Sequence, residues 1–247
     1  AALLVIVVGS LAGEWLSVHN YMSDAISFYW GHQGYEYVDL GRIWQIGLLI
    51  GLLLWLFLMV RVLLPALRQQ GEQKQLVALL AVASTAIALF YGAGLTWGRH
   101  TNLSIVEYWR WWVVHLWVEG VWELILGSLM SFLLIKLTGV DREVVEKWLY
   151  VIVGFTFLSG ILGTGHHYYF IGTPRYWLWI GGIFSALEPL AFLGMAIYAI
   201  AMVRKGGRQH PNRNALAWTV GCAVLSFVGA GFLGFAHTLP QVNLYTH

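Results

Sequence analysis

The chain has 247 residues, of which 59% are hydrophobic and only 11% are charged. This composition excludes a water-soluble globular domain, which needs a largely polar surface. The net charge is only +2 and the basic residues form no stripe, which excludes nucleic acid as a partner. The single cysteine, Cys222, excludes an internal disulfide. We therefore predict a multi-pass membrane protein with membrane lipid as its solvent.

Seven apolar runs follow one another along the chain, and a helix needs about 20 apolar residues to cross a bilayer. Because backbone polar groups in lipid must bond within their own segment, these runs predict an all-α transmembrane helix bundle. The first span is partial. The predicted spans are residues 1–16, 43–64, 76–95, 109–137, 144–171, 177–203 and 216–237.

Ten of the fourteen Lys and Arg residues flank three alternate connections, which the positive-inside rule makes cytoplasmic. The ten are Arg61, Arg68, Lys74, Lys136, Arg142, Lys147, Arg204, Lys205, Arg208 and Arg213. Residues 17–40 are then the longest outward-facing segment, and we expect them to cap the outer face. Residues 1–247 are interpreted as a single membrane domain, because most connections are short. The chain begins in an apolar run without an initiator methionine, so we expect it to be a fragment.

Three carboxylates, Glu119, Glu123 and Glu188, fall inside predicted spans. A charge at the centre of a spanning helix costs roughly 2.5–3.5 kcal/mol on insertion scales, so each is a candidate functional group. The alternative is a protonated or hydrogen-bonded packing residue. His115 precedes Glu119 and Glu123 at intervals of four residues, which places all three on one helix face. A lone histidine would more often be a core residue, whereas imidazole and carboxylate one turn apart can bind one cation.

A second pair of candidate ligands is His166 and His167. Adjacent residues of an α-helix diverge by about 100°, so the two imidazoles reach one metal only if the backbone is distorted. Gly163 and Gly165 make such a distortion easy. The alternative is a pair of interfacial histidines bonded to backbone or water.

Depth in the membrane favours one site for all these groups. His115 lies about six residues, or about 9 Å, inside the outer end of its predicted span. His166 and His167 lie at a comparable depth in the next span, which runs in the opposite direction. Three nitrogens and the oxygen of Glu119 suit iron, copper or zinc better than magnesium or calcium, and we expect a redox metal.

From Trp111 onward the sequence resembles the catalytic subunit of bacterial nitric oxide reductases, within the haem-copper oxidase superfamily. The matching strings are 111–123 (WWVVHLWVEGVWE), 141–150 (DREVVEKWLY), 160–171 (GILGTGHHYYFI), 185–190 (SALEPL), 209–214 (QHPNRN) and 236–247 (AHTLPQVNLYTH). The resemblance implies a place in a larger bundle of about 12 to 14 helices in the bacterial cytoplasmic membrane.

The resemblance also implies a chemistry. His115, Glu119, His166 and His167 would hold a non-haem iron that faces a haem. Oxygen-reducing relatives usually have tyrosine at the position of Glu119, and a carboxylate suits iron where those oxidases use copper. This implies reduction of two NO to N2O and water. Glu123 is then a hypothetical proton donor and Glu188 a further polar group near the cavity.

The N-terminal strings 13–16 (GEWL) and 31–42 (GHQGYEYVDLGR) resemble the single-chain, quinol-dependent form more than the form that takes electrons from cytochrome c through a partner subunit. Tyr35 precedes Glu36 here, whereas the cytochrome c dependent form usually has an arginine before that glutamate. By resemblance, Glu36 is a ligand of a calcium ion. The axial histidines of the two b-type haems belong to spans outside this chain, so we expect the fragment alone to be inactive.

Two other functions stay open. One is an oxygen-reducing terminal oxidase of the same superfamily, which would hold copper at this site. The other belongs to a different class, a proton or ion transporter that uses the buried carboxylates without redox chemistry. Adjacent histidines fit a simple proton path poorly, so nitric oxide reduction is the favoured prediction.

Overall fold

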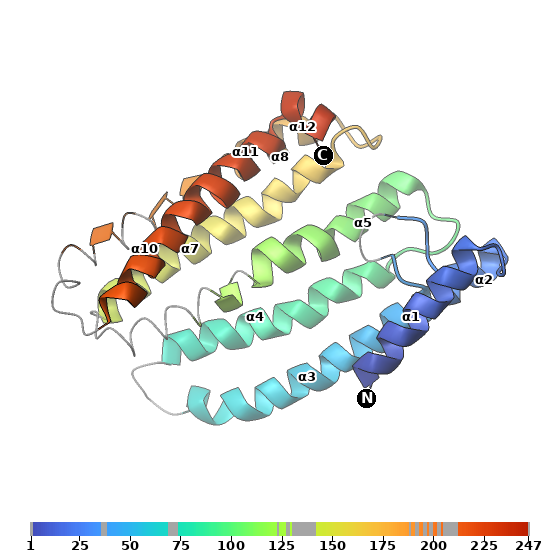
Figure 1. Ribbon diagram of the computed structural model, residues 1–247, viewed down its shortest axis with the longest axis horizontal. Helices are drawn as coiled ribbons and strands as arrows, with labels where there is room; N and C mark the ends of the chain where they lie inside the picture. The colour runs from blue at the N-terminus through green and yellow to red at the C-terminus, as the bar shows by residue number, and fades with distance from the viewer. Residues whose placement is uncertain are drawn as a thin grey trace. The chain divides into compact units, whose positions relative to one another are not determined.

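The computed structural model of the chain forms only helices as regular structure over the residues that it describes (Figure 1), which confirms the all-α prediction for them. The contacts within the chain divide it into two compact units, Ala1–Trp122 and Glu123–His247. The described residues are 2–35, 39–68, 74–122, 124–126, 129, 142–187, 189–190, 193–194, 197, 200–201, 204 and 212–246.

The first unit consists of long helices joined by short connections. Within it, α3 packs against both α1 and α4, and α4 also contacts the π-helix η2 (Figure 1). Its elements are α1 (Ala2–Val18), α2 (Asp24–Trp30), α3 (Arg42–Arg68), α4 (Lys74–Gly92), the 3-10 turn η1 (Ala93–Leu95), α5 (Leu103–His115) and η2 (Leu116–Trp122).

The second unit combines the longer helices α7 and α10 with several short helical segments. The short helix α8 packs along α7 and the 3-10 helix η3, and it also contacts α11. The hydroxyl of Tyr169 lies 3.2 Å from the carbonyl oxygen of Thr238, which ties the end of α11 to the segment after η3. The elements are α7 (Arg142–Gly163), η3 (Thr164–Tyr168), α8 (Trp177–Ser185), α10 (Arg213–Ser226), the π-helix η4 (Phe227–Leu233), α11 (Gly234–Thr238) and α12 (Pro240–Thr246).

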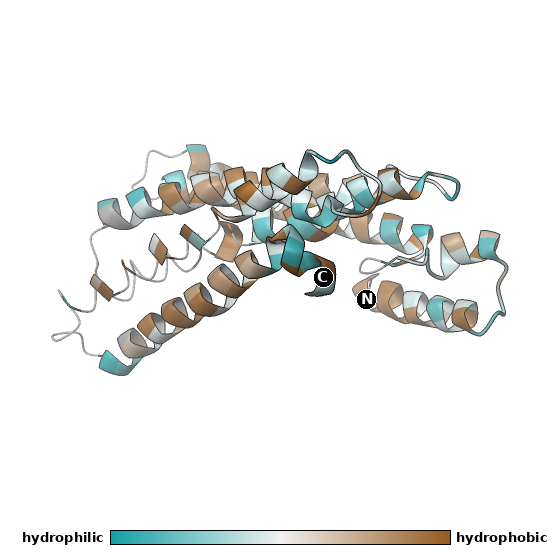
Figure 2. Ribbon diagram, turned by 90° about the horizontal axis from the view of Figure 1, so that it is seen from above, coloured by the Kyte–Doolittle hydropathy of each residue, from teal (hydrophilic) through white to brown (hydrophobic). Residues whose placement is uncertain are grey.

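The long helices have apolar surfaces. Figure 2 shows hydrophobic residues along most of their length. In the most apolar part of α3 only 6% of the residues are buried, and Leu54 and Phe57 are 61% and 59% exposed. A surface of this kind is stable against lipid chains and would associate in water, because large exposed apolar patches are rare on soluble monomers.

Four helical stretches in the described part of the chain are long and apolar enough to cross a membrane, and residues 3–18 form a shorter apolar helix. They correspond to the predicted spans 43–64, 76–95, 144–171 and 216–237, and are Arg42–Arg68, Lys74–Leu95, Lys147–Tyr168 and Arg213–Thr238. The later parts of the predicted spans 109–137 and 177–203 fall largely outside the described residues.

The segment predicted to cap the outer face, 17–40, contains α2 and is fastened to helix ends. Arg42, the first residue of α3, donates hydrogen bonds to the carbonyl oxygens of Gly94, at 2.7 Å, and Trp97. Its guanidinium also lies over the rings of Phe28 and Trp97, at 5.3 and 5.4 Å from their centroids. The buried arginine therefore joins α2, the start of α3 and the end of η1 through carbonyl dipoles and aromatic faces.

Candidate metal centre

The helix that carries His115, α5, begins at Leu103, six residues before the predicted span. The side chain of Asn102 caps it by accepting a hydrogen bond from the backbone N–H of Ser104 at 2.9 Å. The first turn therefore lies outside the apolar run. The depth predicted for His115 is counted from residue 109, where the apolar run begins. The helix itself begins six residues earlier, so this depth is measured from the end of the apolar run and not from the end of the helix.

A buried ion pair occupies the next turn of α5. The carboxylate of Glu107 accepts hydrogen bonds from Arg110 Nε at 2.9 Å and Nη2 at 2.7 Å, and from Trp111 Nε1 at 3.0 Å. All three residues are less than 10% exposed. Sequence reasoning missed this group, although Glu107 lies eight residues before His115 and so continues its polar helix face.

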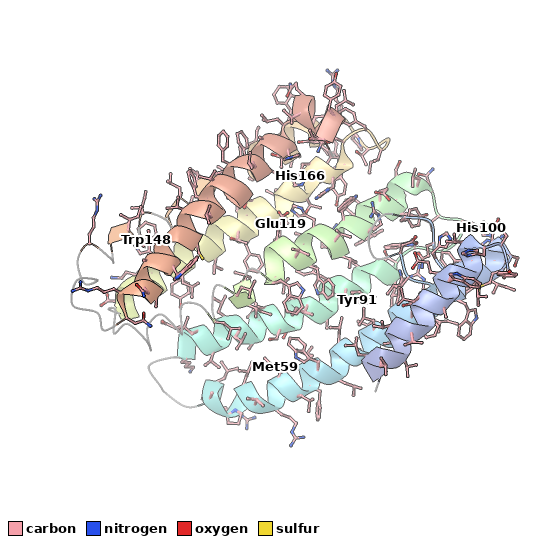
Figure 3. All side chains as sticks on the ribbon, viewed as in Figure 1. Met59, Tyr91, His100, Glu119, Trp148 and His166 are labelled. Carbon is pink, nitrogen blue, oxygen red and sulfur yellow. The ribbon has the colours of Figure 1, made fainter. Side chains whose placement is uncertain are left out.

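His115 and Glu119 are in contact, as their spacing predicted. The ring of His115 is buried, and its Nε2 lies 3.3 Å from Oε2 of Glu119. Glu119, labelled in Figure 3, belongs to η2, where α5 gives way to a π-helix. A π-helix bonds i to i+5 and has more residues in each turn, so it brings residues four apart closer to alignment than an α-helix does.

His166 and His167 lie on η3, where α7 tightens into a 3-10 helix. η3 therefore provides the departure from α-helical geometry that two adjacent histidines need in order to reach one metal. The centroids of the two rings are 4.0 Å apart, and each ring offers a nitrogen within 4.8 Å of one on the other. The pair is thus arranged within this unit as two ligands of one ion would be.

Two glycines allow η3 and α8 to touch at the level of their backbones. A Cβ atom on Gly165 would lie 3.0 Å from the backbone nitrogen of Gly181, and one on Gly181 would lie 2.4 Å from that of His166. Side chains would separate the two segments. One turn beyond Gly181, the hydroxyl oxygen of Ser185 lies 2.8 Å from Nδ1 of His166, which Figure 3 labels.

Three other predicted site residues, Glu36, Glu123 and Glu188, lie outside the described residues. Their roles stay predictions.

The described donor groups fit a transition metal. His115 and Glu119 provide an imidazole and a carboxylate from the first unit, and His166 and His167 provide two imidazoles from the second. Each histidine has a ring nitrogen that can act as a ligand. Imidazole suits iron, copper or zinc, and a carboxylate shifts the preference toward iron. The single cysteine of the chain, Cys222, lies exposed on α10 and is not among these donor groups.

Helices of membrane length, with histidines that could act as metal ligands, define a membrane protein that can hold a transition metal. The whole chain, residues 1–247, matches the family described as Cytochrome C and Quinol oxidase polypeptide I. The chain therefore belongs to this family, which confirms the predicted haem-copper oxidase superfamily.

A similar curated protein is one of the subunits of the nitric oxide reductase from Stutzerimonas stutzeri. The two are 45% identical over 214 residues, which are 87% of this chain and 44% of that protein. The chain thus spans less than half the length of this relative.

Proposed function

We propose that this chain is part of the catalytic subunit of a nitric oxide reductase of the bacterial cytoplasmic membrane. The reaction joins two NO molecules with two electrons and two protons to give N2O and one water. The contact between His115 and Glu119 carries the proposal, because a carboxylate ligand beside histidine favours iron. The identity to a nitric oxide reductase subunit supports it.

In this proposal His115, Glu119, His166 and His167 bind one non-haem iron opposite a b-type haem. When bound, the iron would hold and polarise NO near the haem, with a second b-type haem delivering electrons. The residues of this chain would supply the charge balance of the site and its protection from water. Glu119 would balance the charge of the metal, and the burial of His115 and His166 limits the access of water to it.

The reaction also needs groups that deliver protons and a donor that supplies electrons. We propose Glu123, one turn beyond Glu119, as a proton donor and Glu188 as a further polar group near the cavity. Glu36 is proposed as a ligand of a calcium ion at the outer surface.

Quinol is the proposed electron donor, with cytochrome c through a partner subunit as the alternative. Reduced quinol and reduced cytochrome c, supplied in turn to the full-length protein, would distinguish these donors.

Metal analysis of the purified full-length protein tests the proposal. We expect one non-haem iron beside two haem irons, no copper, and consumption of NO with formation of N2O. Copper at this site together with consumption of O2 would establish the terminal oxidase instead. Proton movement in a protein without haem absorption would establish the transporter.

A further inference from the structure

The hydrogen bond between His166 and Ser185 joins a candidate ligand to a residue outside the predicted ligand set. Nδ1 of His166 lies 2.8 Å from Oγ of Ser185, and the two residues are 19 positions apart in the sequence. Ser185 is fully buried and His166 is 6% exposed. No solvent therefore competes for this bond.

The direction of the bond follows from the other contact of the serine. A serine hydroxyl has one hydrogen, and Oγ of Ser185 donates it to the carbonyl oxygen of Gly163 at 3.4 Å. The lone pairs of Oγ then accept a hydrogen from Nδ1 of His166. In a neutral imidazole with Nδ1 protonated, Nε2 carries the free lone pair.

We infer that Ser185 is a positioning residue for the metal centre: it accepts the Nδ1 hydrogen of His166 and thereby presents Nε2 of that histidine to the metal. This inference rests on the proposed function. Metal-binding histidines depend on such a partner at the second ring nitrogen, which fixes both the tautomer and the orientation of the ring.

The packing of α8 on η3 keeps the serine in place. The backbone contact of Gly165 with Gly181 sets the distance between the two segments, and Ser185 follows Gly181 by one helical turn on the same face. Trp177 packs edge-on against Tyr168, with centroids 4.9 Å apart. The partner of His166 is therefore held on a helix that packs closely against η3.

Replacement of the serine in the full-length protein tests the inference. Ser185→Ala removes the acceptor, and Ser185→Thr keeps a hydroxyl. Ser159→Ala is a matched control, because Ser159 is equally buried on α7 but bonds only the carbonyl of Phe155 among the contacts described, at 2.6 Å. The readout is the non-haem iron that each protein retains in a titration with EDTA, with haem absorption as the measure of folding.

We expect Ser185→Ala to bind iron about 10 to 100-fold more weakly, the range found when partners of metal ligands are removed. Ser185→Thr and Ser159→Ala should retain iron like the wild type. Equal retention in Ser185→Ala would overturn the inference and leave the proposed function intact. A wild-type protein without non-haem iron would instead refute the proposed function. If Ser185→Ala loses its haems, Ser185→Cys replaces it as the test variant, because the cysteine sulfur is only a weak acceptor. Iron retention in Ser185→Cys equal to that of the wild type would overturn the inference.

Discussion

Nε2 of His115 and Oε2 of Glu119 lie 3.3 Å apart, at the junction where an α-helix becomes a π-helix. The contact places an anionic oxygen beside a buried imidazole. The two side chains form half of the proposed metal site.

Replacing Glu119 with glutamine removes the negative charge and keeps the size of the side chain. We expect the full-length Glu119→Gln protein to lose most of its non-haem iron and of its NO consumption, while the haem spectrum is retained. Metal analysis and an NO electrode measure both. Glu143→Gln is the control, because Glu143 is an exposed residue of α7 that pairs with Lys147. Full iron content in Glu119→Gln would show that the carboxylate is not a ligand.

Replacing Glu107 with alanine leaves the buried charge of Arg110 without its carboxylate. Breaking a buried ion pair on one side costs about 3–5 kcal/mol. We therefore expect the thermal unfolding midpoint in detergent to fall by on the order of 10 °C. Glu143→Ala breaks an exposed pair and should cost about 0–1 kcal/mol. Equal shifts in the two variants would contradict a stabilising role for the buried pair.

The alkaline limit of stability should depend on Tyr35. Burial raises the pKa of Tyr35 above its usual value of about 10, Glu107 raises it further, Arg110 opposes this, and Asp39 adds a smaller increase. Below pH 10 the phenol is neutral in both states, so its contribution is complete there. Above pH 10 the unfolded state ionises first, and stability is lost as the pH rises toward the folded pKa.

We therefore expect the unfolding temperature of the wild type to fall more steeply above pH 10 than that of Tyr35→Phe. Differential scanning fluorimetry across pH 8–11 measures the slopes. Tyr245→Phe serves as the control, because Tyr245 is 84% exposed. Parallel slopes for wild type and Tyr35→Phe would rule out this tyrosine as the source of the alkaline sensitivity.

Local features were predictable because they depend on neighbours in sequence. The apolar runs predicted spanning helices, since lipid leaves the backbone no other way to satisfy its polar groups. The four-residue spacing predicted the contact between His115 and Glu119, because a helix turn aligns such residues. The glycines before His166 predicted a change of helix geometry, which η3 provides.

Tertiary structure decided what depends on distant parts of the chain. The hydrogen bond between His166 and Ser185 depends on a backbone contact between two glycines on different helices, which no periodicity reveals. The burial of Arg42 depends on carbonyl groups more than fifty positions away. The sequence by itself therefore determined the membrane class and the chemical types of the candidate ligands. The packing of α8 on η3 decided which polar side chain bonds His166, because a hydrogen bond between two helices forms only when the helices approach closely enough.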